Sequence, residues 1–151
     1  MSSFASRFKW ALALFSLCFM ATSQAEQKQV FGDYEVHYNV FNSTFLQPEV
    51  ARQYNINRSR AIGVVNIAVL KKNPEGGLPT PVAASLEGEI TNQVQQQTRL
   101  AFRRIVEGPA IYYLADFHFS QNDPLVFTVR VMGDPSQPPM AIRFSKTMFA
   151  N

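Results

Sequence analysis

The stretch from residue 34 to residue 40 alternates between apolar and polar side chains. Tyr and Val occupy the even positions, and Glu, His and Asn occupy the odd positions. A period of two residues predicts a strand with one face in the core and one face in solvent. The stretch 61–70 is instead almost entirely apolar and rich in Val and Ile, which predicts a central strand covered on both faces.

Five more runs that suit strands follow, and they are separated by residues that favour turns. The runs cover 82–92, 99–106, 111–119, 125–132 and 140–149. Gly, Pro, Asn and Asp gather at 73–77, 107–109, 122–124 and 133–135. Seven strands at this spacing predict an all-β chain, folded as a single immunoglobulin-like antiparallel β-sandwich of about seven strands.

Two segments leave alternatives open at this stage. Residues 86–106 fit either a hairpin or a helix, because the glutamine-rich part at 93–97 has no alternation, although the β-branched residues around it favour the hairpin. Residues 41–59 form a long connection for a small domain. Within it, Pro48 suits the first helical position and Glu49 suits the positive end of a helix dipole. One short helix is therefore predicted in the first long connection.

The first 25 residues have the composition of a secretory signal peptide. Arg7 and Lys9 precede a short apolar run, and small residues at 23 and 25 suit a signal peptidase. The apolar run has about half of the ~20 residues that a membrane-spanning helix needs. We expect a signal peptide at 1–25 and one periplasmic or secreted domain at 26–151, with no transmembrane segment. Lipidation of Cys18 is disfavoured, because the preceding Leu17 is large.

Removal of this segment changes the charge of the chain. Two of its 14 Lys and Arg residues lie within the signal peptide, and 12 basic residues then face 11 acidic ones. Such a small net charge gives no support to a nucleic-acid partner. The single cysteine lies in the signal peptide too, so we expect no disulfide and no thiolate chemistry in the mature domain.

Two blocks of sequence resemble a known family. The first runs from residue 34 to residue 46 (Tyr-Glu-Val-His-Tyr-Asn-Val-Phe-Asn-Ser-Thr-Phe-Leu) and continues with Pro-Glu-Val-Ala at 48–51. The second is Arg-Ser-Arg at 58–60, which leads into Gly-Val-Val-Asn-Ile at 63–67. Together they resemble the domain-of-unknown-function family 4426, small exported proteins of Gram-negative bacteria. The resemblance covers the whole mature chain and implies export and a single compact domain, but it assigns no catalytic residue.

The candidate catalytic residues come from a repeated acid-x-His pattern. Glu35 and His37 share one strand face, as do Asp116 and His118, and two imidazoles with two carboxylates suit a divalent metal ion. An immunoglobulin-like strand order would, however, place one strand between the two pairs and separate them by about 9 to 10 Å. Solvated strand-face histidines are the alternative. We therefore expect no metal and no cofactor.

The candidate binding residues lie in the first long connection. Asn42, Ser43 and Thr44 could bind a peptide or a small polar ligand, or they could cap the strand exit and the following turn. Arg58 and Arg60 could bind a carboxylate or a phosphate, or they could be solvated.

A basic and aromatic cluster follows at 99–104. Its arginines face the acidic side chains of Glu87 and Glu89 if the two segments pair, and the charges then serve as cross-strand partners.

The sequence contains no complete catalytic motif. A Gly-x-Ser-x-Gly turn, a His-Glu-x-x-His pair and a phosphate-binding glycine loop are all absent from it. The leading hypothesis is a non-catalytic periplasmic binding or interaction module with a protein or peptide partner. A metal-assisted periplasmic hydrolase and a structural subunit of an envelope complex are the alternatives.

Overall fold

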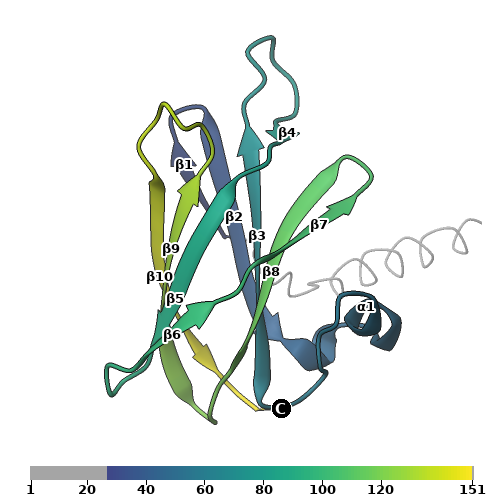
Figure 1. The fold of residues 1–151 in the computed structure, drawn as a ribbon, viewed down its shortest axis with the longest axis vertical. Helices are drawn as coiled ribbons and strands as arrows, with labels where there is room; N and C mark the ends of the chain where they lie inside the picture. The colour runs from purple at the N-terminus through teal and green to yellow at the C-terminus, as the bar shows by residue number, and fades with distance from the viewer. Residues whose placement is uncertain (1–26, 151) are drawn as a thin grey trace, which may run out of the picture.

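Two antiparallel β-sheets face each other in the computed structural model, which describes residues 27–150 (Figure 1). The first sheet has the order β1-β2-β3-β8-β7, and β4 pairs with β3. Its strands are β1 (Gln27–Phe31), β2 (Tyr34–Asn42), β3 (Ile62–Lys71), β4 (Thr80–Pro81), β7 (Arg103–Glu107) and β8 (Ala110–His118). The second sheet has the order β10-β9-β5-β6. Its strands are β5 (Ser85–Thr91), β6 (Gln97–Leu100), β9 (Asp123–Met132) and β10 (Met140–Met148).

The predicted alternation fixes which side chains enter the core. Val36 and Val40 of β2 are buried between the sheets, and the central strand β3 is buried almost throughout. An aromatic series joins the layers: Tyr38 stacks on Phe144 with ring centroids 4.3 Å apart, and Phe144 stacks on Phe127 at 4.9 Å. The all-β sandwich predicted from the sequence is confirmed.

The strand count differs from the predicted seven, because ten strands occur among residues 27–150. β1 and β4 are short and carry too few residues to show a period. The predicted strand at 99–106 is divided: β6 pairs with β5 in the second sheet, and the chain then crosses to β7 in the first sheet (Figure 1). The hairpin alternative for 86–106 is correct in its first half, since Ser85–Thr91 and Gln97–Leu100 pair antiparallel.

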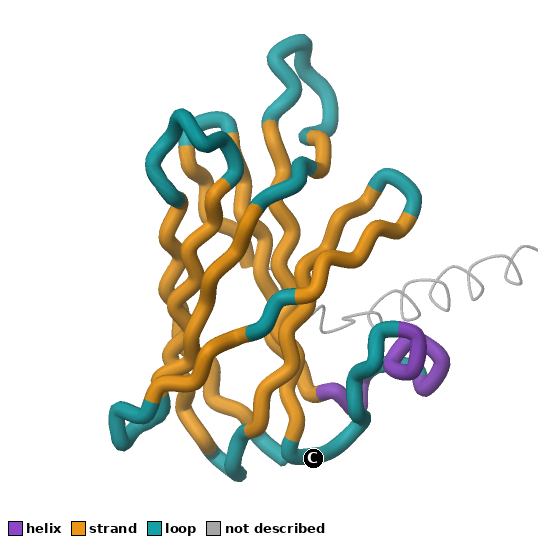
Figure 2. The backbone as a smooth tube through the Cα atoms, in the orientation of Figure 1, coloured by secondary structure: helices purple, strands orange, loops and turns teal. Residues whose placement is uncertain are grey.

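Among residues 27–150, helical structure is confined to the first long connection, shown in purple in Figure 2. A 3-10 helix, η1, spans Ser43–Phe45, and the α-helix α1 spans Pro48–Gln53 with Pro48 in its first turn. This confirms the predicted short helix. A second apolar cluster lies between this connection and the outer face of the first sheet. It contains Ile56, Val64, Ile105 and Leu114, with Phe41, Leu46, Tyr54 and Tyr112 packed at its border.

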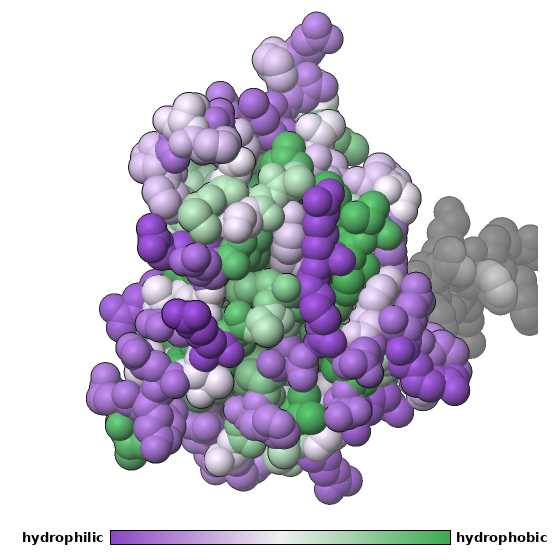
Figure 3. Space-filling view, in the orientation of Figure 1, coloured by the Kyte–Doolittle hydropathy of each residue, from purple (hydrophilic) through white to green (hydrophobic). Residues whose placement is uncertain are grey.

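The side of the sandwich where the chain crosses between sheets is less closed. In Figure 3, apolar side chains reach the surface in the middle of this face and hydrophilic side chains surround them. Val82, Leu86, Phe102 and Ile111 are only partly buried against the core. In the described part of the chain, no helix is long and apolar enough to cross a membrane. The predicted signal peptide lies outside the described residues.

Candidate functional site

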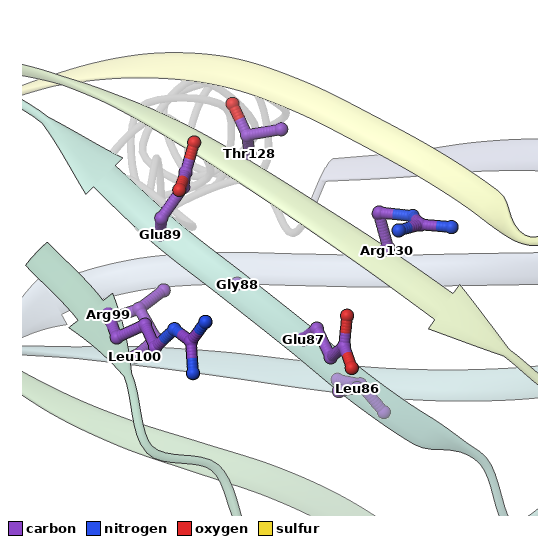
Figure 4. Close-up of a pocket in the computed structure, with 8 residues that line it drawn as sticks. All are labelled: Leu86, Glu87, Gly88, Glu89, Arg99, Leu100, Thr128 and Arg130. Atoms are coloured by element: carbon purple, nitrogen blue, oxygen red, sulfur yellow. The ribbon is translucent and has the colours of Figure 1, made fainter. Parts of the chain in front are cut away.

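A charged groove crosses the outer face of the second sheet. It has a volume of about 410 Å³. Side chains of Glu87, Glu89, Arg99, Thr128 and Arg130 point to the same side of the sheet, and the backbone of Gly88 lies between the two carboxylates (Figure 4). The volume is within the range typical of small-ligand sites, but the groove is open to solvent, and charged and polar side chains line it together with Leu86 and Leu100.

Strand pairing explains why these five side chains meet. Glu87 pairs with Arg130 across β5 and β9, and Glu89 pairs with Thr128 on one side and Arg99 on the other. Residues paired across a sheet point to the same face, so five polar positions from three strands gather in one place. The sheet itself therefore builds the groove, without a contribution from a mobile loop.

The charged side chains of the groove form no salt bridges with one another in the described part of the chain. Among residues 27–150, neither Arg99 nor Arg130 lies within 4.0 Å of a carboxylate oxygen. Glu89 accepts one long hydrogen bond from Gln97, with 3.4 Å between Nε2 and Oε1. Guanidinium and carboxylate groups thus remain available on one surface, where they can bind groups of opposite charge from a ligand.

Glu35 and His37 form a pair on the outer face of β2. His37 Nε2 lies 2.9 Å from Glu35 Oε2, and Lys28 Nζ lies 3.6 Å from the other carboxylate oxygen. The hydrogen bond with His37, assisted by the positive charge of Lys28, holds the pKa of Glu35 below its ordinary value. Side-chain exposure is 13% for Glu35 and 17% for His37, so the pair is half-buried.

The second acid-x-His pair lies far from the first. As predicted, the strand between them is β3; His37 pairs with Ala68 of β3, whereas Asp116 pairs with Val64. The four-residue offset is about 13 Å along the strand, and the two strands lie about 10 Å apart across the sheet. Because these displacements are perpendicular, the two pairs are separated by about 16 Å. Asp116 is also engaged by Arg103. The four residues therefore do not assemble into one site.

The acid-x-His pairs do not form a metal-ligand cluster in the described part of the chain. Among the described residues, no group of three or more His, Cys, Asp and Glu side chains lies close enough to hold an ion. Glu35 and His37 supply two ligands, and a protein zinc site needs three or four.

The candidate binding residues Asn42, Ser43 and Thr44 are engaged by the protein itself. Asn42 Oδ1 accepts hydrogen bonds from the Thr44 amide at 3.0 Å and the Thr44 hydroxyl at 2.9 Å. Asn42 Nδ2 donates to the Arg60 carbonyl at 3.3 Å. Ser43 Oγ donates to the Ser59 carbonyl at 3.1 Å and accepts from the Ser59 amide at 2.9 Å. Asn42 and Ser43 are buried. The geometry supports the structural interpretation of this block.

The two candidate arginines, Arg58 and Arg60, contact the same connection in different ways. Arg58 Nη2 donates to the Thr44 carbonyl at 3.0 Å, so it clamps the turn that Asn42 caps. Arg60 is exposed and contributes its backbone carbonyl to Asn42. Arg103 holds the end of α1, since its Nη1 donates to the carbonyls of Tyr54 at 2.9 Å and Asn55 at 3.1 Å.

The cluster at 99–104 is split by the crossing of the chain between sheets. Arg99 faces Glu89, as the sequence predicts, but Arg103 and Arg104 belong to the other sheet. Sequence reasoning missed Thr128 and Arg130. The alternation in 125–132 places both on an outer face, but nothing in the sequence indicates that this face adjoins Glu87.

Residues 28–151 match the model of a family described as a domain of unknown function, DUF4426. The chain belongs to this family. A DUF4426 protein of known crystal structure, from Pseudomonas aeruginosa PAO1, is 42% identical and superimposes with a TM-score of 0.73. That match covers 85% of this chain and 98% of the other. The family resemblance read from the two sequence blocks is therefore confirmed.

The fold of this DUF4426 domain also occurs in more distant proteins. A copper-bound variant of FetP from uropathogenic Escherichia coli is 10% identical, with a TM-score of 0.60 over 84% of this chain and 97% of that one. A copper-bound variant of Campylobacter jejuni P19 is 13% identical, with a TM-score of 0.51 over 81% and 94%. At these identities the likeness shows the fold alone. No curated protein matches the chain.

Proposed function

We propose that this protein is a non-catalytic binding module of the periplasm that holds a protein or peptide partner in the groove of the second sheet. The observation that carries this proposal is the cross-strand set Glu87, Glu89, Arg99 and Arg130, whose charges share one concave surface without pairing among the described residues. A polypeptide with both acidic and basic side chains complements such a surface.

The chemistry of the groove supports binding rather than catalysis. Among the described residues that line it, none carries an imidazole, thiol or amine, and Thr128 carries the one hydroxyl group. Nucleophilic catalysis needs a nucleophile within hydrogen-bonding reach of a base that a third group orients. The described residues show no hydrogen bond from Thr128 to a base. They also show no group of three or more His, Cys, Asp and Glu side chains that could hold a metal ion, so the metal-assisted hydrolase alternative gains no support either.

A periplasmic location rests on two observations. The sequence predicts a cleavable signal peptide at 1–25. FetP, which shares the fold, has been produced recombinantly in the periplasm. Both support an exported binding module.

The test is capture of partners by the mature protein from periplasmic extract, with chemical crosslinking. The Arg99→Ala and Arg130→Ala double variant should bind the partner at least about ten-fold more weakly and therefore capture much less of it. A ten-fold loss of affinity corresponds to about 1.4 kcal/mol of binding free energy. Its melting temperature should stay within about 2 °C of the wild type, because both side chains are exposed.

The matched control removes two arginines elsewhere. Arg52 lies on α1 and Arg104 on β7, and both are exposed. An Arg52→Ala and Arg104→Ala variant has the same net charge as the groove variant and should capture as much as the wild type. Equal capture by both double variants would refute the groove as the binding surface.

A further inference from the structure

Among residues 27–150, the strand β10 leaves one of its two edges unpaired. It pairs with β9 through nine consecutive residue pairs, Met140 to Met148, without a bulge. It ends the order of the second sheet, so on its other side no described strand pairs with it (Figure 1). It contains neither Pro nor Gly. A long, regular edge of this kind presents unpaired backbone N–H and C=O groups that can pair with another extended chain.

A second concavity lies directly beside this edge. It has a volume of about 210 Å³. Phe144, Ser145 and Lys146 form one wall, and the segment Tyr38–Asn39–Val40 of β2 forms the other. Among the described residues, the pairing of β1 with β2 runs from Phe31 to Gln27, which lies opposite Tyr38 and also lines this concavity.

Stacked aromatic rings support this second concavity, which we call the edge groove. Tyr38 stacks on Phe144 across the two sheets, and Phe144 stacks on Phe127 in the core with an interplanar angle of 4°. An edge already held in its extended form loses little conformational entropy when it pairs with another strand.

The charge of β10 favours one kind of pairing strand over another. Its charged residues are Arg143 and Lys146, both exposed, and it carries no carboxylate. Antiparallel pairing of β10 with a second copy would bring four positive charges together along one ladder, which is unfavourable. An extended segment with acidic side chains complements the same positions.

We propose that β10 and the edge groove accept an extended acidic segment of a partner polypeptide as a fifth strand of the second sheet. This inference rests on the proposed binding function, and it specifies that the partner segment is extended and negatively charged. Main-chain pairing to β10 supplies affinity, Phe144 receives an apolar side chain in the groove, and Lys146 and Arg143 select carboxylates. The added strand would lie about 10 Å from β9, so a partner could reach the charged groove as well.

The probe is the blocked hexapeptide Thr-Glu-Thr-Val-Glu-Thr, titrated into the ¹⁵N-labelled mature protein. In an antiparallel register its glutamates face Lys146 and Arg143, and its valine faces Phe144. We expect amide shift changes concentrated at 143–146 and 38–40. The analogue with lysine in place of both glutamates should bind at least about ten-fold more weakly, and added salt should reduce this difference.

Charge reversal supplies the decisive comparison. The Arg143→Glu and Lys146→Glu variant should prefer the lysine peptide, whereas an Arg52→Glu and Arg104→Glu control should keep the preference for the acidic peptide. Absence of binding, equal binding of both peptides, or shift changes elsewhere would overturn the proposal. So would a dimer in sedimentation velocity that the reversal at 143 and 146 abolishes, because β10 would then pair with a second copy.

The two proposals fail separately. The hexapeptide is too short to reach the charged groove, so the Arg99→Ala and Arg130→Ala variant should bind it normally. If that variant captures partners like the wild type while the peptide still binds β10, the groove is wrong and the edge stands. If capture depends on the groove but the peptide does not bind, the edge is wrong and the groove stands.

Discussion

Two buried polar side chains, Asn42 and Ser43, hold the first long connection in place. Every polar atom of the Asn42 side chain takes part in a hydrogen bond, and the Ser43 hydroxyl both donates and accepts. Polar groups removed from water destabilise a fold unless they are paired. These two residues therefore order a connection that would otherwise be mobile.

Asn42→Ala should lower the free energy of unfolding by about 2 kcal/mol, because it leaves the Arg60 carbonyl and the Thr44 amide without their partner. Thr44→Ala removes one hydroxyl contact and should cost about 1 kcal/mol. Urea unfolding of the mature protein measures both. A variant that keeps its full stability but no longer captures partners would show instead that this block is a binding site.

Glu35 should give the protein an acid-sensitive component of stability. Its pKa is lower in the folded state, chiefly through the hydrogen bond with His37, so its contribution is complete above the unfolded value and is lost as the pH falls through the folded value. Glu35→Gln should therefore lower the melting temperature near pH 7 and lower it by less near pH 3. Glu75→Gln, in an exposed turn, is the control. A constant difference at both pH values would contradict this interpretation.

At the scale of elements, the contact between β3 and β8 depends on a missing side chain. A Cβ placed on Gly63 would lie 2.3 Å from Cζ of Phe117, whose ring packs over the strand. Phe117 also meets the core ring of Phe127 edge-on at 5.3 Å. The close approach of these two strands thus requires glycine at this position.

Gly63→Ala should destabilise the fold by about 1 to 3 kcal/mol through overpacking. Adding Phe117→Leu to this variant should restore part of the loss, because the smaller side chain makes room for the methyl group. Gly133→Ala is the matched control, since its Cβ would meet only ordinary contacts at 3.6 Å and beyond. Thermal unfolding of the wild type, the Gly63→Ala and Phe117→Leu single variants, the double variant and the control tests the coupling, and additive effects of the two changes would refute it.

The alternation along each strand and the turn residues between strands are local properties. They predicted the long strands and the helix at Pro48 from neighbouring residues alone. The crossing between β6 and β7 could not be found in this way, because the run 99–106 keeps its apolar character while Leu100 and Ile105 enter different clusters.

At the scale of the whole molecule, the predicted cleavage after residue 25 would leave a chain that begins just before β1. We expect N-terminal sequencing of the envelope fraction to begin at Glu26. The mature protein should then contain no thiol, since Cys18 lies in the removed segment. Iodoacetamide should leave its mass unchanged. Full-length protein in the cytosol, or an alkylated product, would contradict export with this cleavage.

The sequence by itself determined the sandwich class, the long strands, the short helix and the membership of DUF4426, because each depends on residues close together in the chain or on a whole-length match. Only the tertiary structure decided which polar residues meet. Strand register separated the two acid-x-His pairs by four positions along β3, and it brought Glu87 beside Arg130. Register between strands distant in sequence follows from core packing across both sheets, so one chain segment cannot specify it.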